Sequence, residues 1–358
     1  HRGAARTLLS ERCHRLAVVR RALGILVAVI CIAAVAVLTV PDFFRVERLA
    51  PIAQIIAFRG LIVLALAAVG VLALFASFAR SIRPLAVTVL IVAVVGVVAN
   101  GAVVLDRGIG TESLPAKTDE AIRVMTWNTA GPATSADEIA RLAVAMDADI
   151  VALPETTIET GEQVAIEMRE LGHPMWAHHA KDPSTPWDAG STTLLITPDL
   201  GDYAVIESSA DGTSTTSTVP SAVAMPVSGV GPIVVAAHAV APRAGYMEDW
   251  RADLRWLGDQ CAADNVIMAG DFNATLDHFG GLGVDGGELG RCLDAAAASG
   301  TGAVGTWSTA WPPLFGTAID HVMTTDAWTV TGSLVLSSVD GSGSDHRPLV
   351  VQLEPAAP

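Results

Sequence analysis

The chain has 358 residues, of which 51% are hydrophobic and 16% charged, and its mean hydropathy is +0.47. These values exclude an ordinary soluble domain as a description of the whole chain and indicate a membrane part. Residues 1–105 carry a net charge of +8, whereas residues 106–358 carry −23. This break predicts a membrane domain over 1–105, a short polar linker over 106–120, and an acidic domain over 121–358 that is large enough to bury a core.

The N-terminal third contains three long apolar stretches, at about 22–40, 60–79 and 84–105. Each can cross a hydrocarbon core of about 30 Å as a helix. One such stretch could be a core helix or a signal peptide, but three in succession favour a multi-pass protein of the cell membrane. Six arginines precede the first stretch, and Arg80 and Arg83 stand between the second and third. They predict a cytoplasmic N-terminus and an extracytoplasmic acidic domain, although Arg45, Arg48 and Arg59 weigh against this orientation.

The charge and the cysteines of the acidic domain restrict its chemistry. A charge of −23 argues against strong binding of nucleic acid, which needs Lys and Arg to neutralise phosphates. It leaves phosphate chemistry open, because a bound cation can invert the local field. Cys261 and Cys292 either form a disulfide in an oxidising space, worth roughly 3–4 kcal/mol by chain entropy, or remain buried thiols. Two cysteines do not supply a zinc site.

Short apolar runs bounded by Gly, Pro, Asp or Asn predict strands in this domain, at 122–127, 150–153, 192–196, 233–237, 266–269, 318–323 and 349–353. Helical spacing predicts helices between some of these strands, at 135–146, 161–171 and 246–259. Strands mixed with helices indicate an α/β or α+β domain.

Polar side chains gather where these strands begin or end. They are Asn128, Glu155, His238, Asp271, Asn273, Asp320, Asp345 and His346. Together they offer hard oxygen ligands for Mg²⁺, donors for phosphate oxygens, and an imidazole base for water. The pattern therefore predicts a site that can hold a divalent cation and a phosphate group and activate a water.

The motifs that carry these residues are RVMTWNTA, DIVALPET, VVAAHAV, AGDFNAT, AIDHVM and GSDHRPLV. In this order they resemble the endonuclease/exonuclease/phosphatase superfamily, which includes exonuclease III, deoxyribonuclease I and neutral sphingomyelinases. The resemblance covers roughly residues 120–354. It implies a four-layer α/β (α+β) sandwich of two mixed β-sheets flanked by helices, here preceded by three transmembrane helices, with the site at one edge.

The resemblance also implies a role for each metal-site residue. Glu155 is expected to be the principal ligand of Mg²⁺ or Mn²⁺, with Asn128 beside it and Asp345 assisting. Asp271 is expected to position the attacking water, and Asn273 to orient Asp271 and contact the phosphate.

The imidazoles receive separate roles. His346 is expected to act as general base or as a phosphate-binding group, oriented by Asp320. His238 is expected to contact the scissile phosphate or assist the leaving group. Alternation along a strand points His321 away from Asp320, so a structural role is predicted for it. For Trp307 and Trp311, core packing is favoured over a place on a substrate rim.

Two departures from the family pattern affect these expectations. Pro154 stands where the family commonly has Gln before the metal-binding Glu, which puts the side-chain support of Glu155 in doubt. Neither Tyr203 nor Tyr246 can be assigned to the phosphate-binding tyrosine of the exonuclease III branch. His238 is closer to the deoxyribonuclease I and sphingomyelinase pattern.

The layout resembles a bacterial branch that includes membrane-bound teicoplanin-resistance proteins, which implies polyprenyl pyrophosphate as a substrate. We therefore expect hydrolysis of a phosphate ester or anhydride at the outer membrane face. The substrate would be a lipid-linked (pyro)phosphate or a phospholipid, and membrane lipid the partner. A membrane-tethered extracellular nuclease and a catalytically silent binding or sensor module remain alternatives.

Overall fold

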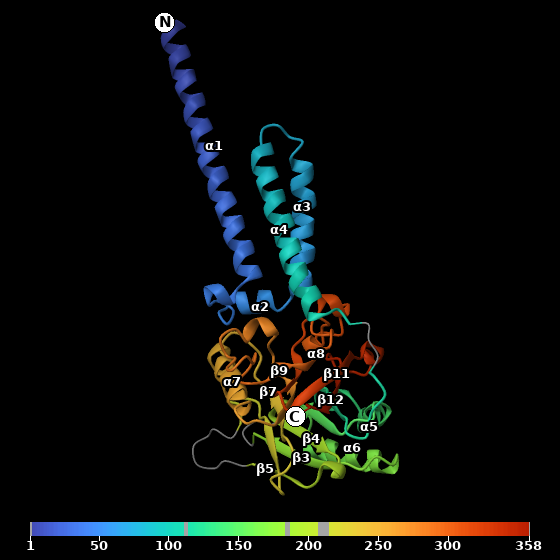
Figure 1. Cartoon of the computed structure of the whole chain (residues 1–358). Coiled ribbons are helices and arrows are strands. Elements are labelled where there is room, and N and C mark those ends of the chain that lie inside the picture. The colour runs from blue at the N-terminus through green and yellow to red at the C-terminus, as the bar shows by residue number, and fades with distance from the viewer. Residues whose placement is uncertain (1, 111–113, 183–186, 207–214, 358) are drawn as a thin grey trace.

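The structure is a computed structural model that describes residues 2–110, 114–182, 187–206 and 215–357. Three long helices stand on a layered α/β body, and the N-terminus lies at the far end of the first helix (Figure 1). These helices are α1 (Arg2–Thr39), α3 (Arg59–Ala76) and α4 (Arg83–Arg107). They contain three segments that are long and apolar enough to cross a membrane, namely Arg21–Thr39, Arg59–Ala76 and Arg83–Arg107.

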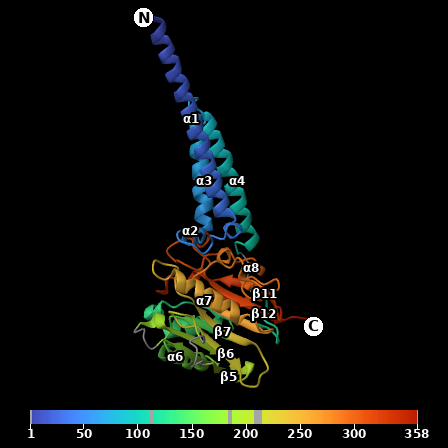
Figure 2. The same cartoon turned by 90° about the vertical axis from the view of Figure 1, so that its left-hand side faces the viewer.

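Residues 40–58, here called the juxtamembrane segment, join α1 to α3. The segment contains the short helices η1 (Asp42–Phe44) and α2 (Ile52–Ile56). It lies between the long helices and the α/β body in both views (Figures 1 and 2). The segment therefore forms part of the surface on which the two parts of the chain meet.

The α/β body contains two six-stranded sheets in the described residues. The first has the order β11-β12-β1-β2-β4-β3, formed by Trp328–Val335, Leu349–Pro355, Ile122–Thr126, Ile150–Pro154, Ser191–Ile196 and Trp176–Lys181. The second has the order β5-β6-β7-β8-β10-β9, formed by Tyr203–Val205, Ala222–Pro226, Ile233–His238, Val266–Asp271, Asp320–Thr324 and Leu293–Asp294. Both sheets are mixed, because β1 pairs parallel to β2 and β7 parallel to β8.

Helices cover the outer face of each sheet, which produces the expected four layers. Helices α5 (Ala136–Ala145) and α6 (Ile158–Glu170) pack on the first sheet, and α7 (Met247–Gln260) packs on the second. A further core cluster fills the space between the sheets. Strands with both faces covered are continuous apolar runs, and β2, for example, is buried throughout. The predicted sandwich of two mixed sheets flanked by helices is confirmed.

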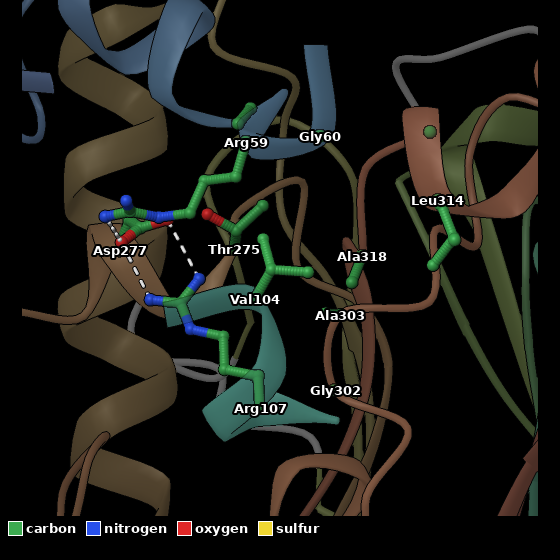
Figure 3. A pocket seen from close by; sticks show the side chains of 12 residues that line it. Arg59, Gly60, Val104, Arg107, Thr275, Asp277, Gly302, Ala303, Leu314 and Ala318 are labelled. Carbon is green, nitrogen blue, oxygen red and sulfur yellow. Dashed lines mark hydrogen bonds and ion pairs between the residues drawn. The ribbon is translucent and has the colours of Figure 1, made fainter. Parts of the chain in front are cut away.

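The long helices are attached to the body through a buried charge cluster. Asp277 binds Arg59 at the start of α3, with Nε–Oδ2 at 2.8 Å, and Arg107 at the end of α4, with Nη1–Oδ2 at 2.9 Å (Figure 3). Arg59 also donates to Asn100 Oδ1 at 2.7 Å, and Asn100 donates to Thr39 Oγ1 at 3.0 Å. This cluster, called the junction below, ties all three long helices to the loop after β8.

The segment expected to be a polar linker is held against the body where it is described. The Gly110 N–H donates to the Gly300 carbonyl at 2.9 Å, and Lys117 forms an ion pair with Asp149 at 2.8 Å. Residues 111–113 lie outside the described residues. In the second sheet's outer layer, a disulfide joins Cys261 to Cys292 and links the end of α7 to the chain before β9.

Candidate active site

The second sheet places three site residues in one row at its edge. Strands β7 and β8 are in parallel register with His238 opposite Asp271, and antiparallel β10 places Asp320 opposite Asp271. Gly270 permits this close approach, since a Cβ there would lie 1.9 Å from the Ala237 carbonyl oxygen. The three side chains are almost fully buried. The register of the strands therefore holds them on a rigid frame.

The first sheet contributes residues from the ends of its parallel pair, β1 and β2. Asn128 follows β1, and Glu155 follows β2 with a left-handed φ of 57°. Asn128 Nδ2 lies 3.2 Å from Glu155 Oε1 and 3.0 Å from Asp271 Oδ2. Two carboxylates from different sheets thus converge on one amide, which places Glu155, Asn128 and Asp271 in a single site.

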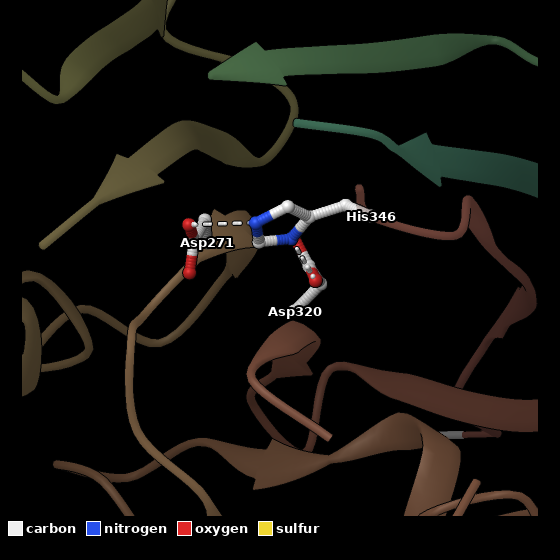
Figure 4. Close-up of side chains that lie close together, drawn as sticks. All are labelled: Asp271, Asp320 and His346. Atoms are coloured by element: carbon white, nitrogen blue, oxygen red, sulfur yellow. Dashed lines mark hydrogen bonds and ion pairs between the residues drawn. The ribbon is translucent and has the colours of Figure 1, made fainter. Parts of the chain in front are cut away.

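His346 joins this site from the loop before β12. Its Nδ1 lies 2.8 Å from Asp320 Oδ2, and its Nε2 lies 3.9 Å from Asp271 Oδ2 (Figure 4). Burial alone would lower the pKa of His346, but the charge and hydrogen bond of Asp320, together with Asp271, raise it. His346 is therefore an imidazolium at neutral pH, with Nδ1–H donated to Asp320 and Nε2–H directed toward Asp271.

Asp271 and His238, which flank this cation, have shifted pKa values. Burial, and then the charge of Asp320, raises the pKa of Asp271 above its usual range, while His346 opposes the change. Burial and the charge of His346 lower the pKa of His238 to about 3. His238 is therefore neutral at physiological pH, with Nε2 3.9 Å from Glu155 Oε1.

Asn273 and Asp345 occupy two sides of the cluster. Asn273 donates its backbone N–H to Asp271 Oδ1 at 2.8 Å and its amide Nδ2 to Asp271 Oδ2 at 3.2 Å. These two hydrogen bonds fix the orientation of the Asp271 carboxylate. Asp345 is more exposed, at 56% of its side chain, and its Oδ1 lies 4.0 Å from His346 Nε2.

Two sets of residues could hold a cation. Asp271, Asp320 and His346 offer ligand atoms within 4.8 Å of one another, so a metal ion is possible there. A histidine must be neutral to bind a metal, however, and the raised pKa of His346 opposes that. Glu155 is 30% exposed, and its carboxylate, that of Asp271 and the Asn128 amide meet at one point. The two carboxylates are the hard oxygen donors that Mg²⁺ and Mn²⁺ prefer, so the donor set at Glu155 fits the cation better.

Several residues that position the site were not assigned a role from the sequence. Ser344 Oγ donates to the Asn128 carbonyl at 2.6 Å and accepts the His346 N–H at 3.0 Å. Trp127 Nε1–H donates to the His346 carbonyl at 3.0 Å. Arg347 is buried and donates to the carbonyls of Gly305, Thr309 and Trp311. Ser344 and Arg347 stand in the quoted motif GSDHRPLV, which is the signal that could have identified them.

The prediction that Trp307 and Trp311 pack in the core is wrong. Trp311 is 48% exposed. Trp307 is partly exposed and donates its Nε1–H to Asp345 Oδ2 at 2.8 Å, so it lies beside the site. Pro312 precedes a 3-10 turn over Pro313–Phe315 in which no residue is buried.

The structural role predicted for His321 is confirmed. Its Nδ1 binds Asp294 Oδ2 at 2.6 Å, and its Nε2 binds the Ala274 carbonyl at 2.8 Å. The side chain is buried, and these two contacts use both ring nitrogens. His321 therefore braces β10 from the side opposite to His346.

A β-sandwich with carboxylates, amides and a carboxylate-bound imidazole at one edge is suited to phosphoester hydrolysis. A family model described as the endonuclease/exonuclease/phosphatase family matches residues 125–346. The chain therefore belongs to this family, whose members are phosphoester hydrolases and nucleases that use divalent metals. A comparison with curated proteins found no match.

Solved structures share the fold of the α/β body. An endonuclease/exonuclease/phosphatase from Beutenbergia cavernae is 21% identical with a TM-score of 0.50, covering 66% of this chain and 72% of that one. TDP2 from D. rerio, complexed with a single-strand DNA product, is 17% identical with a TM-score of 0.51, covering 66% and 100%. At these identities the likeness concerns the fold alone.

Proposed function

We propose that the chain is a Mg²⁺- or Mn²⁺-dependent phosphoesterase that hydrolyses a lipid-linked (pyro)phosphate or a phospholipid at the outer membrane face. The observation that carries this proposal is the convergence of Glu155, Asn128 and Asp271 beside the Asp320–His346 pair. Oxygen donors and an imidazolium are the groups that stabilise a phosphoryl transition state, in which charge gathers on oxygens.

Each residue of the site has a distinct task in this reaction. Glu155 and Asn128 would hold the cation, which supplies charge neutralisation on the phosphate. Asp271 is fixed by Asn273 and can orient the attacking water through the oxygen that faces the site. His346 would donate its Nε2–H to a phosphate oxygen, while Asp320 keeps Nδ1 protonated. His238, which is neutral, would contact the scissile phosphate or the leaving oxygen.

The position of the site beside the juxtamembrane segment supports a lipid substrate. Gln54 donates to the Pro242 carbonyl in the loop after His238, and the Ala53 carbonyl binds His278 in the loop after Asp271 at 3.0 Å. The loops that follow two site residues are therefore in contact with the segment between α1 and α3. The resemblance to the teicoplanin-resistance branch supports a polyprenyl pyrophosphate as the particular substrate.

The extracytoplasmic orientation is supported by the contacts that two arginines make with the α/β body. Arg59 pairs with Asp277, and Arg48 donates to the carbonyls of His278 and Gly280 at 2.7 Å. Because docking to the body accounts for both, they no longer weigh against an outer location of the loop that carries them. A reporter fused after Glu354 should be active only outside the cytoplasm, and cytoplasmic activity would overturn the orientation.

A membrane-tethered nuclease is the second candidate, favoured by the fold shared with TDP2, whose structure holds a single-strand DNA product. The charge of −23 on residues 106–358 opposes it, since binding of DNA requires cationic groups along the phosphates. The deciding experiment is to assay the full chain in lipid nanodiscs with Mg²⁺ or Mn²⁺ against polyprenyl pyrophosphate, phosphatidylcholine and DNA in parallel. Metal-dependent release of a phosphate-containing product from one of the two lipids is expected. Cleavage of DNA alone would establish the nuclease instead.

A further inference from the structure

A short series of side-chain contacts leads from the first residue of a candidate span to the active site. Phe58 directly precedes Arg59, where the span in α3 begins. The ring of Phe58 lies 6.3 Å, centroid to centroid, from that of Trp307. Trp307 in turn donates its indole N–H to Asp345, which neighbours His346. Two aromatic side chains, Phe58 and Trp307, therefore connect the start of α3 with Asp345 and His346.

The loop that carries Trp307 is held rigidly while it displays apolar side chains. The buried guanidinium of Arg347 donates to four of its carbonyls, and a Cβ on Gly60 would lie 1.9 Å from the Leu314 carbonyl oxygen. The loop therefore packs tightly on the start of α3. On this fixed loop Trp311 is 48% and Leu314 45% exposed, and Phe43 of the juxtamembrane segment is 78% exposed.

Exposed aromatic and aliphatic groups at the end of a transmembrane helix suit the interface between water and lipid. Tryptophan in particular favours this depth, where its apolar ring contacts lipid and its N–H contacts water. A rigid loop cannot bury these groups by collapsing. An apolar ligand that continues from the hydrocarbon core toward the site would cover them.

We propose that the juxtamembrane segment and loop 305–316 form an apolar entrance that receives the alkyl chain of the substrate lipid. Phe58 and Trp311 are then specificity-determining residues, which favour a phosphate on a long chain over the same phosphate on a short one. The phosphate enters past Trp307 and Asp345 to reach His346. This inference rests on the proposed phosphoesterase function for the fate of the phosphate, and on the contacts above for the path of the chain.

Photolabelling of the full chain in phosphatidylcholine nanodiscs tests this path. The probe is hexadecyl phosphate with a diazirine on the alkyl carbons next to the phosphate, and the matched control probe is the corresponding hexadecanol. The phosphate probe is expected to label peptides that contain Phe58 or Trp311, whereas the alcohol labels the spans without this preference. Phe58→Ala and Trp311→Ala should each lower the labelling of the other residue's peptide by about tenfold, the effect of one lost aromatic contact.

Trp176→Ala is the matched control variant, because Trp176 is 58% exposed on β3, far from the long helices (Figure 1). Its labelling should equal that of the parent. Phe58→Trp keeps an aromatic ring and should restore labelling, which separates loss of the contact from loss of folding. Equal labelling of the Phe58 and Trp311 peptides by both probes would overturn the proposed entrance. Labelling that is unchanged in both alanine variants would overturn it as well.

Hydrolysis of bis(p-nitrophenyl) phosphate and of hexadecyl and butyl p-nitrophenyl phosphate, measured on the same samples, separates this inference from the proposed function. If these esters are cleaved while the phosphate probe does not label the peptides of Phe58 and Trp311, the proposed entrance is wrong and the phosphoesterase function stands. If the probe labels the entrance but neither these esters nor a lipid phosphate is cleaved, the entrance stands and the proposed function fails. In an active enzyme, the long-chain to short-chain ratio of kcat/KM should fall about tenfold in Phe58→Ala.

Discussion

Two buried charge clusters of the described residues, the junction and the active site, differ in how fully their polar atoms are hydrogen-bonded. At the junction, the carboxylate of Asp277 accepts four hydrogen bonds from Arg59 and Arg107. Burial would raise the pKa of Asp277, but these arginines lower it far below its usual range. At the active site, Asp320 Oδ1 and His238 Nδ1 are buried without a hydrogen-bond partner among the described residues.

The difference between the clusters indicates which one performs chemistry. A carboxylate saturated by two guanidinium groups holds its partners in one geometry and has no capacity left for a ligand. Buried polar atoms without partners cost free energy, and they persist where a ligand, ion or water satisfies them. We therefore assign attachment of the membrane helices to the junction and catalysis to the site. The following variants, in order of expected effect, test this division.

The largest effect is expected from His346→Ala. The change removes the imidazolium that faces Asp271 and leaves the carboxylate of Asp320 without its partner. Loss of a general acid–base group of this kind lowers turnover by roughly 10²–10⁴-fold. Turnover of polyprenyl pyrophosphate with Mn²⁺ measures the loss, and circular dichroism checks that the fold is retained. His178→Ala on β3 is the control and should keep parental turnover. A folded His346→Ala enzyme with near-parental turnover would show that the site is misassigned.

A smaller loss with a change in pH dependence is expected from Asp320→Asn. Asparagine can still accept the Nδ1–H of His346, but it removes the charge that raises the pKa of His346. The imidazolium is then lost at lower pH, so the alkaline limb of the pH–rate profile should move toward neutrality by one or more units. Turnover at its optimum should fall by about 10–100-fold, as for other orienting carboxylates. An alkaline limb at the parental position would mean that another group sets it.

The smallest effect on chemistry is expected from Asp277→Asn at the junction. The change leaves Arg59 and Arg107 buried without an anion, and breaking a buried pair in this way costs about 3–5 kcal/mol. Amide hydrogen exchange should rise in residues 276–280 and 300–304, while turnover of bis(p-nitrophenyl) phosphate changes by less than about threefold. The stabilisation should be present at any pH above the ordinary pKa of Asp and be lost only as pH falls through the lowered pKa, because the lowered pKa favours the ionised form.

Asp264→Asn is the matched control for the junction variant. Asp264 is 91% exposed and pairs with Arg291 on the surface, where ion pairs contribute little. Its hydrogen exchange should match that of the parent. Parental exchange at the junction in Asp277→Asn would show that the long helices are attached by other contacts.

The site was predicted from the sequence to a greater extent than the junction, for a physical reason. Asn128, Glu155 and Asp271 each stand at or just beyond the end of a buried apolar strand, so a local pattern places them at a sheet edge. Arg59 and Asp277 are 218 residues apart and meet only after the helices dock on the body. No local periodicity encodes that contact, and the sequence presented Arg59 only as evidence about membrane orientation.

The same reasoning explains why β3 and β11, two of the five described strands that the sequence did not predict, were missed. Strand β3 (WAHHAK) is at a sheet edge and mostly partly exposed, so it lacks the apolar run that identified the central strands. Strand β11 (WTVTGSLV) is also at an edge, and its apolar residues alternate with small polar residues. Trp307 and Trp311 were placed in the core because large apolar residues are usually buried, a rule that fails for this loop, where Trp311 is 48% exposed.

The measurement that tests the assignment of the catalytic cluster most directly is the binding of Mn²⁺, followed by electron paramagnetic resonance in the parent, Glu155→Gln and Asp277→Asn. Glu155→Gln keeps the size of the side chain but replaces an ionic ligand with a weak one. If the site is as proposed, this variant binds Mn²⁺ at least tenfold more weakly, and excess Mn²⁺ partly restores its turnover by mass action. Asp277→Asn should bind Mn²⁺ as the parent does. Parental affinity in Glu155→Gln, or loss of binding in Asp277→Asn alone, would contradict the assignment of catalysis to the active site and of attachment to the junction.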